Sequence, residues 1–225
     1  MRHFRTLFRA ALLAGLACAV PAGPLTAHVE ESDSCETAKR TNAWCTTGNV
    51  GYVASVPIHS RFLFEVLDAH GHEIIKSRVT CEVCRRAIET DGFCPAHKMG
   101  YVHGEAFMSP ITYRLARAER IDPATVTCPV CRKNMQGIGW CEKDQRGVVG
   151  TFAVTDRAEY DALDAAYRIL LRANAMVPRC ENCAGAIITD GYCAIHRVTW
   201  RAGEAVSGTP PGPAPENAPH PAPGL

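Results

Sequence analysis

The chain has few aromatic residues and no long apolar run. Aromatic side chains make up 7% of its 225 residues, so a short segment holds too little large side chain for a substantial core of its own. No apolar run reaches the roughly 20 residues that a membrane-spanning helix needs, so no transmembrane helix is expected. A small module of this chain therefore needs a cross-link or a metal ion to hold it together.

Motifs typical of common enzyme classes are also missing. The sequence contains no Gly-rich phosphate loop, no nucleophile elbow and no His-Glu-x-x-His pattern. Its 24 Lys and Arg nearly balance its 23 Asp and Glu, and nothing in this balance would attract nucleic acid. The sequence thus favours a protein that is not an enzyme and has no nucleic-acid partner.

Residues 1–27 have the order of a secretory signal peptide. A basic start is followed by the apolar run 10–20, which is too short to span a bilayer, and then by proline and small residues. Cleavage after Ala27 is preferred to cleavage after Ala22, and it leaves a net charge near −2 because the leader carries three basic and no acidic residues. The leader predicts a periplasmic or secreted protein. A lipid anchor at Cys18 is the alternative.

Cysteine is what the sequence has in excess, with 12 residues, nine of which recur at a fixed spacing. Each of three copies contains Cys-x-x-Cys, nine further residues, a third cysteine, two residues, and then His or Asp. A glycine two places before the third cysteine and an aromatic residue directly before it also recur, so the copies are internal repeats. The candidate ligands are Cys81, Cys84, Cys94 and His97; Cys128, Cys131, Cys141 and Asp144; and Cys180, Cys183, Cys193 and His196.

A degenerate copy precedes these three. Cys35 and Cys45 have the spacing of the second and third cysteines, while the two outer ligand places hold Ser32 and Gly48. A copy that keeps only its two inner cysteines can replace the metal by a cross-link. We therefore expect a disulfide between Cys35 and Cys45.

Export favours disulfides, but the cysteine count favours metal. Three cysteines in one copy always leave one thiol without a partner, whereas three thiolates and a histidine make a complete tetrahedral ligand set. A structural zinc site contributes roughly 10–16 kcal/mol of apparent binding energy, enough to decide whether a small module folds. We expect up to three zinc ions, with disulfides between copies as the alternative. Three thiolates and one aspartate are an unusual set for a closed structural site, so water in place of the Asp144 carboxylate is the alternative there.

The pattern Cys-x-x-Cys, nine residues, Cys-x-x-His resembles the zinc-ribbon class, in which two ligand-bearing turns clamp an ion. The resemblance implies a local fold and zinc, but no activity. The expected fold is α+β, with tandem small zinc-ribbon-like β units of which the first three are each followed by a helix. In each unit the first cysteine pair is expected in a turn, followed by two strands around a hairpin, as at Asp91-Gly92, a second turn and a third strand.

The repeats divide the chain into unit 1 (28–77), unit 2 (78–124), unit 3 (125–176) and unit 4 (177–206, without a helix), followed by a disordered Pro-rich tail (207–225). The helices are expected from Arg61 to Ala69 after Ser60, from Ile111 to Ile121 after Ser109-Pro110, and from Asp156 to Asn174 after Thr155. The last of these helices has one apolar stripe, formed by Leu163, Ala166, Tyr167 and Leu170. The aromatic residues before the third cysteines are expected to pack in small cores beside the metal. They are Trp44, Phe93, Trp140 and Tyr192.

Three functions remain open. The favoured one is an exported, non-enzymatic zinc-binding repeat protein that acts as a structural or interaction scaffold for a partner in the cell envelope. A metal-handling protein would instead exchange zinc or copper at unit 3 or at His70 and His72. A thiol–disulfide redox protein would use the Cys-x-x-Cys pairs, although no strand followed by a helix beginning at the motif is expected here.

Overall fold

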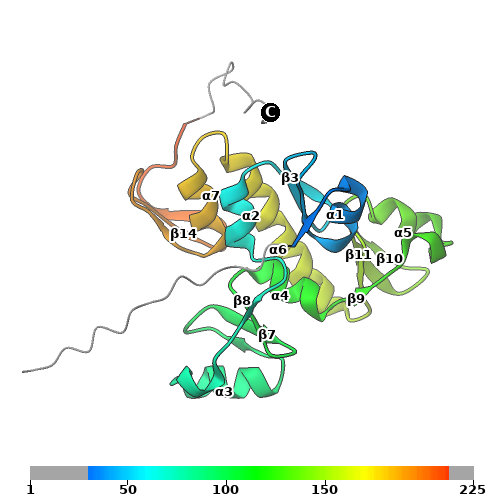
Figure 1. The fold of residues 1–225 in the computed structure, drawn as a ribbon, viewed down its shortest axis with the longest axis horizontal. Helices are drawn as coiled ribbons and strands as arrows, with labels where there is room; N and C mark the ends of the chain where they lie inside the picture. Colours follow the sequence, from blue (N-terminus) through cyan, green and yellow to red (C-terminus); the bar gives the residue numbers. More distant parts are fainter. Residues whose placement is uncertain (1–29, 213–225) are drawn as a thin grey trace, which may run out of the picture.

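Short helices and small sheets alternate along residues 30–212, the part of the chain that the computed structural model describes (Figure 1). The fold is α+β, as predicted. The expected signal peptide lies outside the described residues, as do residues 213–225 of the expected tail. In the described part, no helix is both long and apolar enough to cross a bilayer.

Each unit contains, in this order, a helix, a short strand and a β-hairpin. In unit 2 these are α3 (Glu82–Glu89), β6 (Phe93–Cys94), β7 (Met99–Val102) and β8 (Glu105–Phe107), followed by α4 (Pro110–Arg117). The same order recurs in α1 (Cys35–Thr41), β2 (Trp44–Cys45), β3 (Val50–Val53), β4 (Val56–Ile58) and α2 (Arg61–Leu67), and in α5 (Pro129–Asn134), β10 (Ile138–Cys141), β11 (Arg146–Val149), β12 (Phe152–Val154) and α6 (Arg157–Met176). Unit 4 has α7 (Glu181–Ile188), β13 (Tyr192–Cys193), β14 (Val198–Arg201) and β15 (Glu204–Ser207).

The predicted turn and hairpin around the first cysteine pair are wrong. A helix begins there instead, with Cys81 as the N-cap of α3. Asp91 follows that helix in left-handed backbone with φ 49°, and its Oδ1 accepts the N–H of His103 at the hairpin tip, at 2.8 Å. The same bond recurs from Ala54 to Asn42 and from Ala202 to Asp190. In this protein Asp-Gly therefore ends a helix and ties it to a hairpin.

The strands that follow α2 and α4 each join the sheet of the next unit. After α2, β5 (His72–Glu73) pairs antiparallel with β8, and after α4, β9 (Glu119–Arg120) pairs antiparallel with β12. In unit 1 this edge is β1 (Glu31–Ser32), which pairs parallel with β2. Two short 3-10 helices, Lys76–Arg78 and Pro123–Thr125, lead from β5 and β9 into the next cysteine pair. Neighbouring units are thus linked by backbone hydrogen bonds.

Helices α2, α4 and α6, which follow the sheets of units 1, 2 and 3, begin at the predicted caps, with one exception. Ser60 caps α2, its Oγ accepting the N–H of Leu63 at 3.0 Å, and Ser109 precedes α4, whose first residue is proline. The helix α4 ends at Arg117 rather than Ile121 because the chain then enters β9. The cap of α6 is Asp156 rather than Thr155, since its Oδ1 accepts the N–H of Glu159 at 2.8 Å.

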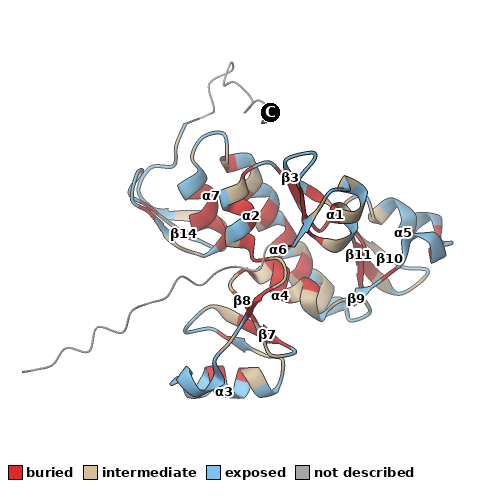
Figure 2. Cartoon of the chain, viewed as in Figure 1, coloured by how far each residue is buried: buried red, intermediate tan, exposed pale blue. Residues whose placement is uncertain are grey.

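The main core is built by helices from several units. Helices α2, α4, α6 and α7, here called the helical hub, pack together, and the predicted apolar stripe of α6 is buried in it. Figure 2 shows the buried residues concentrated there and α3 at the periphery, largely exposed. The cores around the cysteines of units 2 and 3 are separate and small. That of unit 2 holds only Cys84, Ala87, Cys94, Tyr101 and Ala106 as buried residues.

The aromatic residue before the third cysteine packs against a ring from the helix of its own unit. The centroid distances are 5.4 Å for Trp44–Phe64, 5.7 Å for Phe93–Tyr113 and 5.4 Å for Trp140–Tyr160. Unit 4 has no such helix, and Tyr192 is 58% exposed. The prediction of core packing is therefore wrong for Tyr192 and also for Phe93, which is 41% exposed.

Candidate metal centres

In unit 2, four ligand atoms converge from a helix start and a β-turn. Cys81 caps α3, Cys84 lies in its first turn, Cys94 ends β6, and His97 lies in the turn before β7. His97 Nδ1 lies 3.3 Å from Cys84 Sγ and 3.5 Å from Cys94 Sγ. All four ligand atoms lie within 4.8 Å of one another.

Unit 4 repeats this arrangement at α7 and β13. His196 Nδ1 lies 3.5 Å from Cys183 Sγ and 3.7 Å from Cys193 Sγ, and Cys180 Sγ lies 3.9 Å from Cys193 Sγ. The third and fourth ligands again come from a short strand and the turn after it. Two units far apart in sequence therefore build the same site.

These separations fit a tetrahedral metal ion. Zinc binds sulfur at about 2.3 Å and nitrogen at about 2.0–2.1 Å, so two ligand atoms on one tetrahedral ion lie roughly 3.5–3.8 Å apart. A disulfide would bring two sulfurs to about 2.05 Å. All nine cysteines of units 2, 3 and 4 are free in the structure, so disulfides between these units are not formed. Each of the three groups could hold a metal ion.

Unit 3 gathers its three cysteines and Asp144 in the same way, with a different neighbour. Cys128 Sγ lies 3.7 Å from Cys141 Sγ, and Cys131 Sγ lies 3.1 Å from Asp144 Oδ2. Arg146 on β11 places its guanidinium 3.6 Å from the same carboxylate oxygen. Arg146 belongs to none of the motifs in the sequence. Comparison with the apolar residues at the same place in units 2 and 4, Met99 and Val198, would have found it.

The second cysteine of each motif holds its proton tightly. Burial, aided by the neighbouring thiols, raises the pKa of Cys84 to about 11 and that of Cys183 to about 12. Burial also raises the pKa of Cys131 to about 12, together with the hydrogen bond from its thiol to Asp144. A metal ion at these sites must therefore displace a proton.

The third cysteine behaves in the opposite way. Burial by itself would raise the pKa of Cys94 and Cys193, but donors outweigh it and bring both values to about 7. The donors are the backbone N–H and imidazole of His97 or His196, together with the other two thiols of the unit. The pKa of Cys141 is lowered as well, chiefly by the backbone N–H of Asp144. The pKa of Cys81 is also lowered, chiefly by the backbone N–H of Cys84. Each of units 2, 3 and 4 therefore offers at least one thiol that more readily becomes a thiolate, the form that binds metal.

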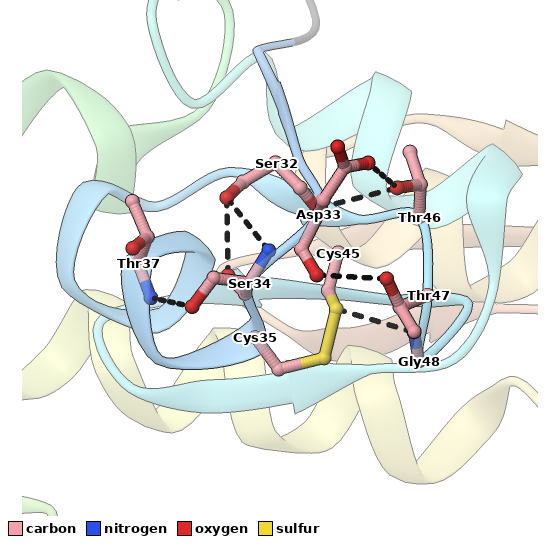
Figure 3. The surroundings of a disulfide bond; sticks show 9 residues. All are labelled: Ser32, Asp33, Ser34, Cys35, Thr37, Cys45, Thr46, Thr47 and Gly48. Atoms are coloured by element: carbon pink, nitrogen blue, oxygen red, sulfur yellow. Dashed lines mark hydrogen bonds between the residues drawn. A yellow bond between two sulfur atoms is a disulfide. The ribbon is translucent and has the colours of Figure 1, made fainter.

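Unit 1 has a cross-link where the other units have a ligand set. The sulfur atoms of Cys35 and Cys45 are at disulfide bonding distance, with Cα atoms 4.9 Å apart (Figure 3). Gly48 occupies the place of the fourth ligand, and a Cβ there would lie 2.5 Å from Cys35 Sγ. The hydroxyls of Thr46 and Thr47 donate to Asp33 across the same loop. Replacement of the outer ligand by glycine thus makes room for the sulfur.

The histidines proposed as a labile metal site have other partners. His72 Nδ1 lies 2.7 Å from Asp68 Oδ2, and both side chains are buried. His70 Nε2 lies 3.2 Å from the backbone oxygen of Asn42. Among residues 30–212, neither histidine belongs to a group of three or more potential metal ligands.

Comparison with protein-family models, with curated proteins and with solved structures found no match to this chain. The three ligand groups have the spacing of zinc-ribbon-like repeats.

Proposed function

We propose that the chain is an exported, non-enzymatic repeat protein that binds zinc at three sites and acts as a structural or interaction scaffold in the cell envelope. The observation that carries this proposal is the convergence of three sets of four ligand atoms at tetrahedral spacing. Zinc fits best because it accepts mixed thiolate, imidazole and carboxylate ligands in a tetrahedron. Export rests on the leader in residues 1–27.

A structural role for the metal follows from how little else holds units 2 and 3. The buried residues around their sites are few, and several are the cysteines themselves. Such clusters bury too little apolar surface to offset the entropy of ordering the loops around them. In units 2 and 3 the metal ion that the thiolates share therefore stabilises the fold. In unit 1 the Cys35–Cys45 disulfide takes the place of that ion.

The scaffold role rests on repetition. Four small sheets surround one helical hub, and the sheets of units 2 and 3 each include a strand from the preceding unit (Figure 1). In repeat proteins such arrays present similar modules in fixed positions, which suits binding of a protein partner.

Elemental analysis combined with thiol counting tests the proposal. Protein isolated from its own compartment is expected to hold three zinc ions per chain and, after denaturation with chelator, nine free thiols from units 2, 3 and 4. Absence of stoichiometric metal, with unchanged folding in strong chelator, would contradict it.

Metal handling is a second candidate, favoured by the different ligand set of unit 3. A protein that delivers zinc or copper must release it, and the carboxylate of Asp144 is a weaker partner for soft ions than imidazole or thiolate. Competitive titration separates the two functions, because uniformly tight and inert binding at all three sites would exclude exchange.

Redox chemistry has gained one supporting feature. Helices α3, α5 and α7 begin at the Cys-x-x-Cys motif, where a turn was predicted. The parallel strand that precedes such a helix in oxidoreductases is not found among the described residues, since β5 and β9 pair antiparallel and α7 follows α6. A third thiol and a histidine or aspartate nevertheless complete each group, as a metal site requires and a redox pair does not. Disulfide reductase or oxidase activity of metal-free protein would favour the redox function.

A further inference from the structure

Unit 3 departs from its sister units at two places at once. The fourth ligand place holds Asp144 where units 2 and 4 hold His97 and His196. Two residues later, the first residue of the next strand is Arg146, where the sister units have Met99 and Val198, and unit 1 has Val50. An arginine thus replaces an apolar residue only in the unit whose fourth ligand is a carboxylate.

The two substituted residues are in contact. The Arg146 guanidinium lies 3.6 Å from Asp144 Oδ2, and the two side chains are 28% and 26% exposed. Arg146 Nε is buried and has no hydrogen-bond partner in the described part of the chain. Asp144 Oδ2 in turn lies 3.1 Å from Cys131 Sγ, so the arginine adjoins the ligand group itself.

Charge explains why the substitutions occur together. A dication with three thiolates and a neutral imidazole carries one net negative charge, whereas a carboxylate in place of the imidazole makes it two. Partly burying the second charge is costly unless a cation lies beside it. The guanidinium of Arg146 restores the charge that the sites of units 2 and 4 would have.

We propose that Arg146 is a positioning residue that orients Asp144 and offsets its charge, so that unit 3 binds a divalent metal ion with a Cys3Asp set. This inference rests on the proposed function, and it assigns unit 3 a complete site. The opposing possibility is that the arginine takes the place of the cation and keeps the site empty.

Substitution of Arg146 distinguishes these possibilities, with zinc as the probe and competition against a chromophoric chelator as the readout. Arg146→Val introduces the residue that units 1 and 4 carry at this place, so the fold should accept it. We expect the affinity of one of the three sites to fall about 10–100-fold, as is typical when a partner of a metal ligand is lost. The other two affinities should stay the same.

Two further variants separate contact from general charge. Lys143→Val removes an exposed cation next to Asp144 in sequence and should leave all affinities within about twofold, since surface charges are screened. Arg146→Lys keeps the charge and should retain most of the third affinity. In an Asp144→His background, Arg146→Val should cost much less, because no carboxylate remains to orient.

The outcomes separate this inference from the proposed function. If the natural chain binds two zinc ions and Arg146→Val leaves that number unchanged or raises it to three, the role of Arg146 is refuted while the sites of units 2 and 4 stand. If no site binds zinc, both proposals fail. Circular dichroism of the metal-free variants checks that they share the fold of the natural chain.

Discussion

Thiol protonation sets how each site responds to pH. At neutral pH the metal-free protein keeps protons on Cys84, Cys131 and Cys183, whose pKa values are about 11 to 12, while Cys94 and Cys193 with pKa values near 7 are partly ionised. The bound state has no thiol protons, so protons compete with the metal. Affinity is therefore expected to rise with pH and to fall as pH drops below 7.

Calorimetry in buffers of different ionisation enthalpy measures this release of protons. We predict that zinc binding at pH 7 releases protons at every site, so the observed heat should depend on the buffer. The raised pKa of His97 adds to the effect in unit 2, because a protonated imidazole cannot bind metal through Nδ1. Heats that do not depend on the buffer would contradict the assignment of these thiols as ligands.

Gly48 lies so close to the Cys35–Cys45 disulfide that there is no room for a larger side chain. A Cβ at this place would meet Cys35 Sγ at 2.5 Å and Cys45 Sγ at 3.3 Å. We predict that Gly48→Ala destabilises the oxidised protein by about 1–3 kcal/mol, as overpacking usually does. Denaturant unfolding measures the change. Gly212→Ala is the control because a Cβ there meets nothing within 4 Å, and equal stability of the two variants would refute this explanation.

At the scale of elements, α3 and α7 occupy the same place in their units but have different support. Helix α3 buries only Cys84 and Ala87, whereas α7 buries six of its eight residues and belongs to the helical hub. The fold of α3 therefore depends on its metal site much more than the fold of α7 does.

Hydrogen exchange should show this difference directly. With chelator, the amides of α3 and α5 are predicted to lose protection, while those of α6 and α7 keep most of theirs. Helix α1 is the internal control, because the Cys35–Cys45 link should keep it protected in chelator and release it only when a reductant is added. Equal loss in all five helices, or none in α3, would contradict this account.

The sequence predicted those elements whose signals are local. The cap at Ser60, the start at Ser109-Pro110 and the apolar stripe of α6 are all found as expected. The helix at the first cysteine pair was missed because Asp91-Gly92 offers the left-handed backbone that both a hairpin and a helix end require. In the structure Asp91 also accepts a hydrogen bond from His103, 12 residues away, and a local pattern does not contain such a contact.

The candidate sites were predictable because their spacing recurs, and the structure brings together every residue of the three ligand sets. The surroundings of the sites were not predictable in the same way. Arg146 belongs to no motif, and its importance depends on contact with Asp144. The exposure of Tyr192 likewise follows from a missing helix and not from any property of the tyrosine.

The whole molecule combines a helical hub, which contains the cysteines of unit 4, with the separate small cores around the sites of units 2 and 3. The hub draws residues from all four units, and unit 2 contributes to it through α4. No unit is therefore an independent domain in its packing. Strand pairing links unit 1 to unit 2 through β5 and β8, and unit 2 to unit 3 through β9 and β12. We predict that chelation expands the molecule and loosens its periphery without unfolding the hub. Small-angle scattering together with far-ultraviolet circular dichroism should show a larger radius and a retained helix signal.

The central claim is that the sulfur atoms of units 2, 3 and 4 are metal ligands. X-ray absorption at the zinc edge of the purified full chain tests it most directly. The account predicts a shell dominated by sulfur at about 2.3 Å, with one nitrogen or oxygen neighbour per ion at about 2.0–2.1 Å. A shell of nitrogen and oxygen alone, or the absence of zinc from folded protein, would contradict it.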